Sequence, residues 1–282
     1  MAWGLSVRRM GHDKLRKFAE NETFACLLQP SAEELLADGY ASLRDHGIKG
    51  GWAKFFGNDH PIVLELGCGK GEYTIDLAER DPSKNYIGVD IKGARLWKGA
   101  KYATQHGLAN VAFLRTRIEF ISAFFAPGEV SEIWLTFSDP QYKSPNSRLT
   151  SPYFLERYSR FLAPGGTVHL KTDSRYLYEY TKAVCVENAL EVLCSTEDLY
   201  SETCGFVAAR PELREVQTFY ERMFLDQGYR ITYTAFKIDR EGGYVLPTSF
   251  DSDYWRSIEG DRQLFGRDTA ETRRQKMHTV EG

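Results

Sequence analysis

The stretch IVLELGCGKGEY, residues 62–73, decides the fold of this chain. It begins as an apolar run interrupted only by Glu65, passes through three alternating glycines, and continues with the helical apolar spacing of Tyr73, Ile75 and Leu77. A buried strand, a glycine turn and a helix in this order predict the first unit of an α/β sheet.

The same alternation continues along the chain. Further strands are predicted at residues 85–90, 110–115, 132–137, 167–173 and 231–238, with helices at 94–107, 118–125, 151–166 and 175–189. We therefore predict an α/β fold with a Rossmann-like, doubly wound, mostly parallel sheet. The predicted domain covers residues 61–240, between a basic arm with lead-in helices at 1–60 and a C-terminal extension at 241–282.

Acidic residues lie at or beside the ends of predicted strands: Glu65, Asp90, Asp139 and Asp173. The carboxyl ends of parallel strands share one edge of a sheet, where ligands of such folds bind. Several carboxylates close together at one edge destabilise the fold unless each one meets a hydrogen-bond donor or a cation. This edge is therefore the predicted binding site.

The glycine turn holds Gly67, Gly69 and Gly71, which let a ligand approach the backbone closely. A dinucleotide-binding turn has the spacing GxGxxG, but Glu72 stands where its third glycine would be. Glu65 would repel a pyrophosphate and suits a ligand with a cationic end, such as S-adenosylmethionine. Asp90 lies about 20 residues beyond the turn, where a carboxylate accepts ribose hydroxyls. The pattern favours S-adenosylmethionine over NAD.

The stretch FSDPQYKSPNSRLT, residues 137–150, follows a predicted strand. Pro140 fixes its own φ and biases Asp139 away from helix, so the loop presents one carboxylate rigidly. Ordinary turn chemistry is the alternative. Lys143 and Arg148 could hold phosphates, or belong to a solvated loop. Tyr142 could stack on a base or simply pack.

Composition limits the function classes. The 282 residues include 42% hydrophobic residues and carry a net charge of −3, so no global excess of positive charge indicates a polyanionic partner. Basic residues do crowd the first twenty positions, where a solvated tail is the alternative to RNA contacts. No apolar run approaches the roughly 20 residues that a membrane span needs, so we expect a cytoplasmic protein with no membrane partner. Five cysteines without a CxxC pair and scattered histidines predict no metal site.

The motifs ELGCGKG at 65–71, GVD at 88–90, FSDPQYK at 137–143, RLT at 148–150, KTD at 171–173 and QTFYE at 217–221 resemble those of the tRNA (guanine-N7)-methyltransferase family. The likeness runs from about Lys14 to about Ile238. The resemblance implies a class I methyltransferase fold, S-adenosyl-L-methionine as cofactor, and tRNA as substrate, methylated on guanine 46 of the variable loop. It leaves open whether the protein is a monomer or a homodimer and which tRNAs it modifies.

The resemblance also implies roles for individual residues. Cofactor contacts are implied at Glu65, Gly67, Gly69, Gly71, Asp90, Arg117, Ile118, Glu119 and Asp139, the last facing both cofactor and base. Substrate contacts are implied at Lys143, Arg148, Asp173, Thr218, Phe219, Tyr220 and Glu221. The chain departs from the family at Arg117, where an acid is common, in a shorter loop that keeps only Arg148, and in TFYE where TKFE is common.

Guanine N7 carries a lone pair and no proton, so its methylation needs alignment and charge stabilisation rather than a general base. Asp139 is the predicted catalytic residue, because a carboxylate attracts the charge that develops on the base. Two alternatives remain at this point: a methyltransferase acting on a small molecule or a protein, and a catalytically inactive RNA-binding module.

Overall fold

The computed structural model describes residues 13–36, 43–240 and 243–259. The basic residues Arg8, Arg9, Arg273, Arg274 and Lys276 lie outside these ranges, as do parts of the predicted arm and extension. Among the described residues, no helix is both long and apolar enough to cross a membrane.

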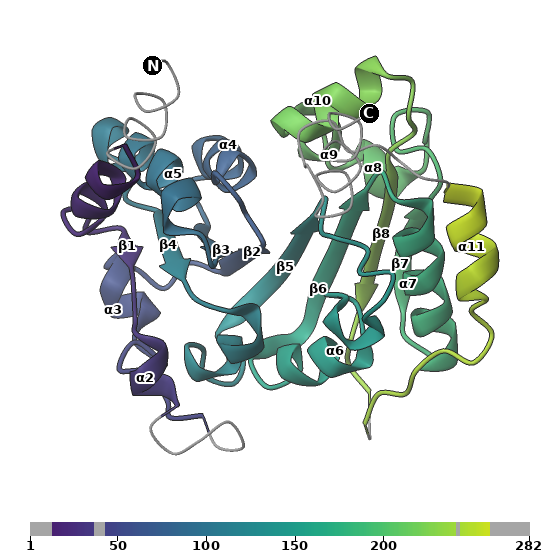
Figure 1. Ribbon diagram of the computed structural model, residues 1–282, viewed down its shortest axis with the longest axis horizontal. Helices are drawn as coiled ribbons and strands as arrows, with labels where there is room; N and C mark the ends of the chain where they lie inside the picture. The colour runs from purple at the N-terminus through teal and green to yellow at the C-terminus, as the bar shows by residue number, and fades with distance from the viewer. Residues whose placement is uncertain (1–12, 37–42, 241–242, 260–282) are drawn as a thin grey trace, which may run out of the picture.

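The described strands form one sheet, in the order β1-β4-β3-β2-β5-β6-β8-β7 (Figure 1). Their bounds are β1 Leu27–Leu28, β2 Ile62–Leu66, β3 Asn85–Asp90, β4 Val111–Arg115, β5 Val130–Thr136, β6 Leu162–Thr172, β7 Val192–Thr196 and β8 Thr232–Lys237. The strands from β1 to β6 pair in parallel, and β8 runs antiparallel to both β6 and β7. The predicted doubly wound, mostly parallel sheet is confirmed.

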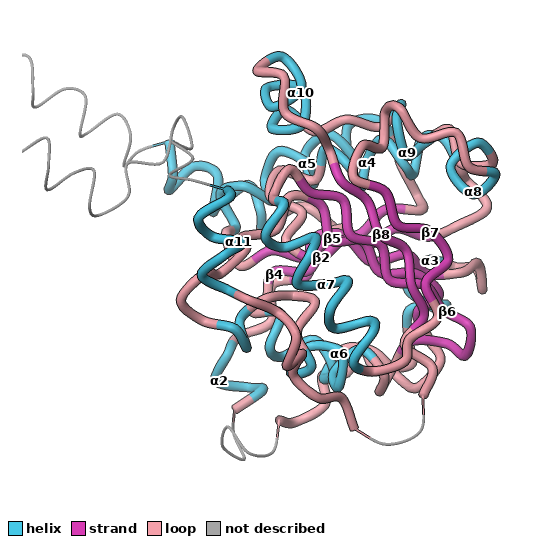
Figure 2. Tube along the Cα trace, turned by 90° about the vertical axis from the view of Figure 1, so that its right-hand side faces the viewer, coloured by secondary structure: helices cyan, strands magenta, loops and turns pink. Residues whose placement is uncertain are grey.

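Helices cover both faces of the sheet (Figure 2). One face packs against η1 (Ile118–Ala123), α6 (Pro152–Tyr158) and α7 (Arg175–Glu187), and the other packs against α4 (Glu72–Arg80), α5 (Gly93–His106), α9 (Glu212–Glu215) and α10 (Phe219–Asp226). The remaining elements are α2 (Ala32–Leu35), α3 (Trp52–Phe56), η2 (Pro145–Ser147), α8 (Gly205–Ala208) and α11 (Ser252–Glu259). Residues 13–21 are also helical. The apolar strands are buried because each lies between two layers of helices.

Most predicted elements appear with small shifts in their ends. The strand predicted at 62–66 is β2, and the helix predicted at 94–107 is α5, which ends before Gly107 in the left-handed region at φ 64°. The helix predicted at 151–166 is wrong beyond Tyr158, because Leu162 already pairs with Val130 at the start of β6. The helix predicted at 118–125 is the 3-10 helix η1.

Candidate active site at the carboxyl edge of the sheet

Strand order reverses at β2, which pairs with β3 on one side and β5 on the other. Such a switch point opens a crevice at the carboxyl ends of the strands, where ligands of doubly wound folds bind. Glu65 in β2, Asp90 in β3, Asp139 after β5 and Asp173 after β6 all lie at this edge. The arrows of β5 and β6 point towards it in Figure 1. The structure therefore brings the four predicted acids to one edge.

The glycine turn presents bare backbone at this edge. Gly67 and Gly69 have φ of 84° and 59°, and a Cβ at either position would have no atom within 4 Å. The turn is held against β3 because the amides of Gly67 and Cys68 both donate to the carbonyl oxygen of Val89, at 2.8 and 3.0 Å. An exposed, rigid backbone of this kind fits a cofactor that packs against the turn.

Gly71 has a different role from the other two glycines. Its φ is 74°, and a Cβ there would lie 2.5 Å from a ring carbon of Phe113. A Cβ at Gly99 in α5 would meet the same ring at the same distance. Gly71 therefore lets α4 and α5 pack closely over the sheet, and the cofactor contact implied for it stays a prediction.

Glu65 lies beneath the turn and is only 4% exposed. Its Oε2 accepts hydrogen bonds from the amide, at 2.9 Å, and the hydroxyl of Thr74, and its Oε1 accepts from the Thr136 hydroxyl at 2.6 Å. Burial raises the pKa of this carboxyl to about 7, against the opposing effect of the threonine hydrogen bonds. Near neutral pH its charge therefore depends on what binds nearby: a cationic ligand favours the ionised form.

Asp90 fixes the turn to the end of β3. Its Oδ2 accepts from the amide of Gly69 at 3.1 Å, and its Oδ1 accepts from the amide of Lys92 at 2.7 Å. Each carboxylate oxygen has a second acceptor site, so the residue can also accept ligand hydroxyls. This geometry fits a ribose held beside the glycine turn.

The predicted adenine segment begins directly after β4. Arg115 at the end of β4 is in register with Asp90, so Arg117, Ile118 and Glu119 follow beside the end of β3 that carries Asp90. Arg117 Nη2 lies 3.2 Å from Glu119 Oε1, and both side chains are partly exposed. Arg117 is therefore paired with the glutamate two residues later in the chain.

The loop after β5 is strained where it presents Asp139. Phe137 and Gln141 have φ of 51° and 49°, although neither is glycine. Residues in this region cost about 1–3 kcal/mol, and such strain clusters at functional sites. The Phe137 amide donates to the carbonyl of Lys171 at 2.9 Å, and Asp139 Oδ1 accepts from the Gln141 amide at 3.0 Å. Asp139 itself is exposed, so the loop presents its carboxylate at the surface in a fixed position.

The two cations predicted to hold phosphate have opposite environments. Lys143 is exposed, whereas Arg148 is 2% exposed. Arg148 Nε donates to the carbonyl of Pro140 at 3.1 Å, and its guanidinium lies 4.3 Å from the ring centre of Tyr180. A guanidinium enclosed in this way offers no surface to a phosphate. Direct substrate contact by Arg148 is therefore not supported, and the residue instead braces the Asp139 loop.

The segment Thr218–Glu221 opens α10 beside the glycine turn. Thr218 caps the helix by accepting from the amide of Glu221 at 3.1 Å. The Phe219 amide donates to Glu72 Oε2 at 3.1 Å, which ties this segment to the first residue of α4. Phe219 and Tyr220 are 53% and 47% exposed and meet edge to face at 5.8 Å. They form an exposed aromatic pair next to the cofactor turn.

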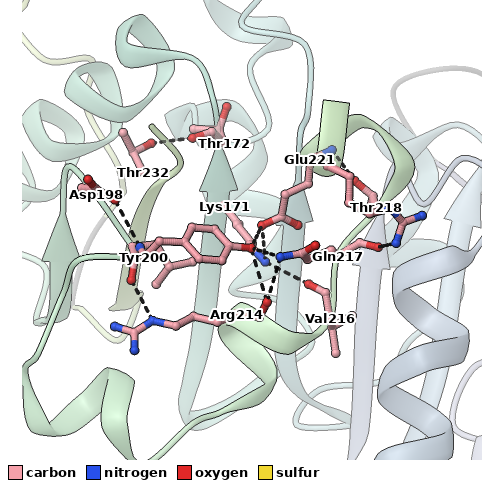
Figure 3. A network of polar contacts seen from close by, with 12 residues as sticks. Lys171, Thr172, Asp198, Tyr200, Arg214, Val216, Gln217, Thr218, Glu221 and Thr232 are labelled. Carbon is pink, nitrogen blue, oxygen red and sulfur yellow. Dashed lines mark hydrogen bonds and ion pairs between the residues drawn. The ribbon is translucent and has the colours of Figure 1, made fainter. Parts of the chain in front are cut away.

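Glu221 points inward rather than towards this surface. Figure 3 shows its carboxylate meeting Lys171 from β6, with Nζ and Oε1 2.7 Å apart and both side chains fully buried. Lys171 Nζ also donates to the Val216 carbonyl at 3.0 Å, and the Tyr200 hydroxyl donates to Glu221 Oε1 at 2.9 Å. Burial lowers the pKa of Lys171 and raises that of Glu221, and the attraction between the two charges opposes both shifts. Glu221 therefore holds α10 to the sheet, and direct contact of its carboxylate with a substrate is not supported.

Lys171 is a residue that the sequence reasoning did not assign. Its backbone anchors Phe137, and its side chain anchors α10, so it links the two loops of the site. Its position inside a predicted buried strand could have identified it, because a lysine is rarely buried without a partner of opposite charge.

The described part of the basic arm makes mostly internal pairs. Arg16 lies 2.7 Å from both Asp13 and Glu20, and Lys17 lies 2.8 Å from Asp13. The helix at 13–21 also packs on α5, where Glu20 accepts from the indole of Trp97 at 2.6 Å. Arg16 and Lys17 pair with acids of their own helix, which reduces the charge that they can offer to RNA. Arg8 and Arg9 lie outside the described residues.

Comparison with known proteins agrees with this site. The family model described as "Putative methyltransferase" matches residues 59–231. A tRNA (guanine-N(7)-)-methyltransferase of Bacteroides thetaiotaomicron is 49% identical over 90% of this chain and 97% of its own length. Enzymes of the same name are 53% identical in Porphyromonas gingivalis, over 77% of this chain and 88% of their own, and 50% identical in Christiangramia forsetii, over 80% and 98%.

The family-model match at residues 59–231 includes the glycine turn, the Asp139 loop and the start of α10. The relatives match most of this chain and nearly the whole of their own length. Identities of this size over nearly the whole of each relative are far above what a shared fold alone produces. The chain belongs to the tRNA (guanine-N7)-methyltransferase family.

Proposed function

We propose that this chain transfers the methyl group of S-adenosylmethionine to N7 of guanine 46, in the variable loop of tRNA. The observation that carries the proposal is the strained loop after β5, which holds an exposed Asp139 at the switch point beside the open glycine turn. Family membership supports the same reaction.

S-adenosylmethionine supplies an electrophilic methyl group on a sulfonium. The chain's own residues would hold it by the backbone of Gly67 and Gly69 and by Asp90, whose carboxylate suits the ribose hydroxyls. Glu65 acts from below the turn: its carboxyl, with a pKa of about 7, gains charge when a cation lies near it. Arg117, Ile118 and Glu119 are assigned to the adenine end.

The reaction needs no proton acceptor, because N7 of guanine already carries a free lone pair. Positive charge develops on the imidazole ring of the base as the new bond forms. A carboxylate fixed near that ring attracts this charge more strongly in the transition state than in the ground state, which lowers the barrier. Asp139 is assigned this role, and its rigid loop means that little reorganisation accompanies the step.

The RNA is assigned to the same edge of the sheet. Phe219 and Tyr220 form an exposed aromatic pair on which an extruded base could stack. Lys143 is exposed and suits a phosphate. Asp173, directly after β6, and Thr218, the N-cap of α10, are assigned to contacts with the substrate. Because the relatives of this name come from bacteria, where tRNA is made in the cytoplasm, we assign the activity there.

The experiment is methylation of bulk tRNA with isotopically labelled S-adenosylmethionine, followed by mass spectrometry of the nucleosides. We expect the label in 7-methylguanosine, and at least about tenfold less of it when Asp90→Ala replaces the native protein at a limiting cofactor concentration, because that substitution should weaken cofactor binding by about 1.5–3 kcal/mol. A label in protein or in a small molecule would favour the first alternative, and failure to bind cofactor would favour an inactive RNA-binding module.

A further inference from the structure

The C-terminal extension packs against the active site. Helix α11 lies along the outer side of α7, on the face of that helix turned away from the sheet (Figure 1). The path into α11 runs past Phe250, which is partly buried against the main core. No role was predicted for residues 241–282, but residues 250–259 contact the elements that present Asp139 and Asp173.

Glu259 accepts hydrogen bonds at the start of α7. Its Oε2 accepts from the Ser174 hydroxyl at 3.0 Å and from the Tyr176 amide at 3.1 Å, and the residue is 9% exposed. Ser174 in turn caps α7 by accepting from the Leu177 amide at 3.1 Å. A carboxylate at a helix N-terminus is stabilising because it meets unpaired amides and the positive end of the helix dipole. Glu259 thereby holds the residue that directly follows Asp173.

Phe250 and Ser252 complete the enclosure of Arg148. The Ser252 and Tyr176 hydroxyls lie 2.7 Å apart, and the guanidinium of Arg148 donates to that same Tyr176 hydroxyl. The Phe250 ring meets the edges of Tyr176 and Tyr180 at 5.1 and 5.2 Å. Its own centre lies 5.9 Å from the guanidinium of Arg148. The extension therefore supplies one wall of the aromatic cage around Arg148.

Arg148 in turn contacts the Asp139 loop. Its Nε donates to the carbonyl of Pro140, the residue after Asp139. The extension also reaches the loop directly, because the guanidinium of Arg256 lies 5.7 Å from the ring centre of Tyr142. Residues 250–259 therefore contact the Asp139 loop in two ways, through Arg148 and through the Arg256–Tyr142 contact. They also contact Ser174, the residue after Asp173, through Glu259.

We propose that residues 250–259 position the Asp139 loop and the start of α7 for methyl transfer, and that Glu259 is a positioning residue of the active site. This inference rests on the proposed function. The contacts are concentrated on the inner side of α11: Glu259 is buried, whereas Asp253, Tyr254 and Ile258 are exposed. Removing a contact on the inner side should therefore change the geometry at Asp139 and Asp173, and removing an outer charge should not.

The test compares Glu259→Gln with Asp253→Asn in the full chain. Both variants remove one carboxylate charge from α11, but only the first removes it from the start of α7. At saturating tRNA and cofactor, we expect Glu259→Gln to slow single-turnover methyl transfer about tenfold, which is about 1.4 kcal/mol of barrier. The affinity of Glu259→Gln for S-adenosylhomocysteine should stay within about twofold of the native value. The saturated rate of Asp253→Asn should also stay within about twofold of the native rate.

An unchanged saturated rate with Glu259→Gln, or an equal loss in both variants, overturns the inference. A lower melting temperature with the native rate would show a structural role only, and would also overturn it. If Glu259→Gln does not fold, Ser252→Ala removes only the hydroxyl beside Tyr176, and the same slowed transfer with native cofactor affinity is expected. The proposed function fails separately, if the native chain itself makes no 7-methylguanosine.

Discussion

Replacing Lys171 with methionine removes the cation from the buried network in Figure 3 while keeping the length and most of the volume of the side chain. Lys171 and Glu221 are both fully buried, with Nζ and Oε1 2.7 Å apart. The substitution leaves the Glu221 carboxylate inside the protein without its cationic partner, although the Tyr200 hydroxyl still donates to it. We expect a large loss of stability.

The magnitude follows from the burial of the pair. Removing one partner of a buried ion pair costs about 3–5 kcal/mol, because the other charge is left uncompensated. For a chain of this size that corresponds to a fall on the order of 10 °C in melting temperature. Glu221 can escape by taking up a proton. Since its folded pKa then lies above the unfolded value of 4.5, the penalty should shrink as pH falls towards 5 and grow towards pH 8.

The assay is urea unfolding in a double-mutant cycle, with Glu221→Leu as the second change. Removing both charges should cost at least about 2 kcal/mol less than the sum of the single changes, because the two side chains are directly coupled. Lys182→Met is the matched control: this lysine pairs with Glu179 at 3.2 Å on the surface and is 40% exposed, so its loss should cost under about 1 kcal/mol. Additive single effects, or equal costs for Lys171→Met and Lys182→Met, would refute the reasoning.

Three further predictions concern ligand binding and the rate. Asp90→Ala should weaken S-adenosylmethionine binding by about 1.5–3 kcal/mol in calorimetric titration, because it removes the acceptor for the ribose hydroxyls; an unchanged dissociation constant contradicts this. Cofactor affinity should rise with pH between 6 and 8, because the folded pKa of Glu65 is about 7 and a cationic ligand binds its ionised form better. Glu65→Gln should flatten that pH dependence, and a slope that survives the substitution would assign it to another group. In single-turnover methylation, Asp139→Asn should lower the saturated rate by about 2–4 kcal/mol in barrier with tRNA binding little changed, whereas Lys143→Ala should mainly weaken tRNA binding. A native saturated rate with Asp139→Asn, or native tRNA binding with Lys143→Ala, would contradict these roles.

The sequence was sufficient for the parts of the fold that depend on local pattern. Strands β2 and β3 are continuous apolar runs closed by turn residues, and both were predicted with the observed bounds. Residues 162–166 were misassigned because Pro164 and the two following glycines resemble a helix stop. In the structure Leu162 pairs with Val130, which is a long-range contact that no local pattern reports.

Side-chain roles depended more strongly on tertiary packing. Lys143 and Arg148 are both cations on one loop, and sequence alone treats them alike. Arg148 is enclosed by Tyr176 and Tyr180 from α7 and by Phe250 from the extension, so its burial arises from two segments that are far from it in the chain. Glu221 was assigned to the substrate by the family resemblance, and its pairing with Lys171 on β6 is a long-range contact that the sequence alone does not report. The acids at strand ends were easier to predict because parallel topology alone brings them together.

The central claim is that the methyl group is transferred to N7 of guanine 46, and replacing that single atom tests it most directly. Two tRNA transcripts, one with guanine and one with 7-deazaguanine at position 46, would be compared for binding and for incorporation of labelled methyl from S-adenosylmethionine. We expect both to bind with similar affinity, because the exchange of N7 for a carbon leaves the phosphates and the stacking face of the base in place. Only the guanine transcript should become labelled. Equal labelling of the two transcripts, or labelling of neither, would contradict the account.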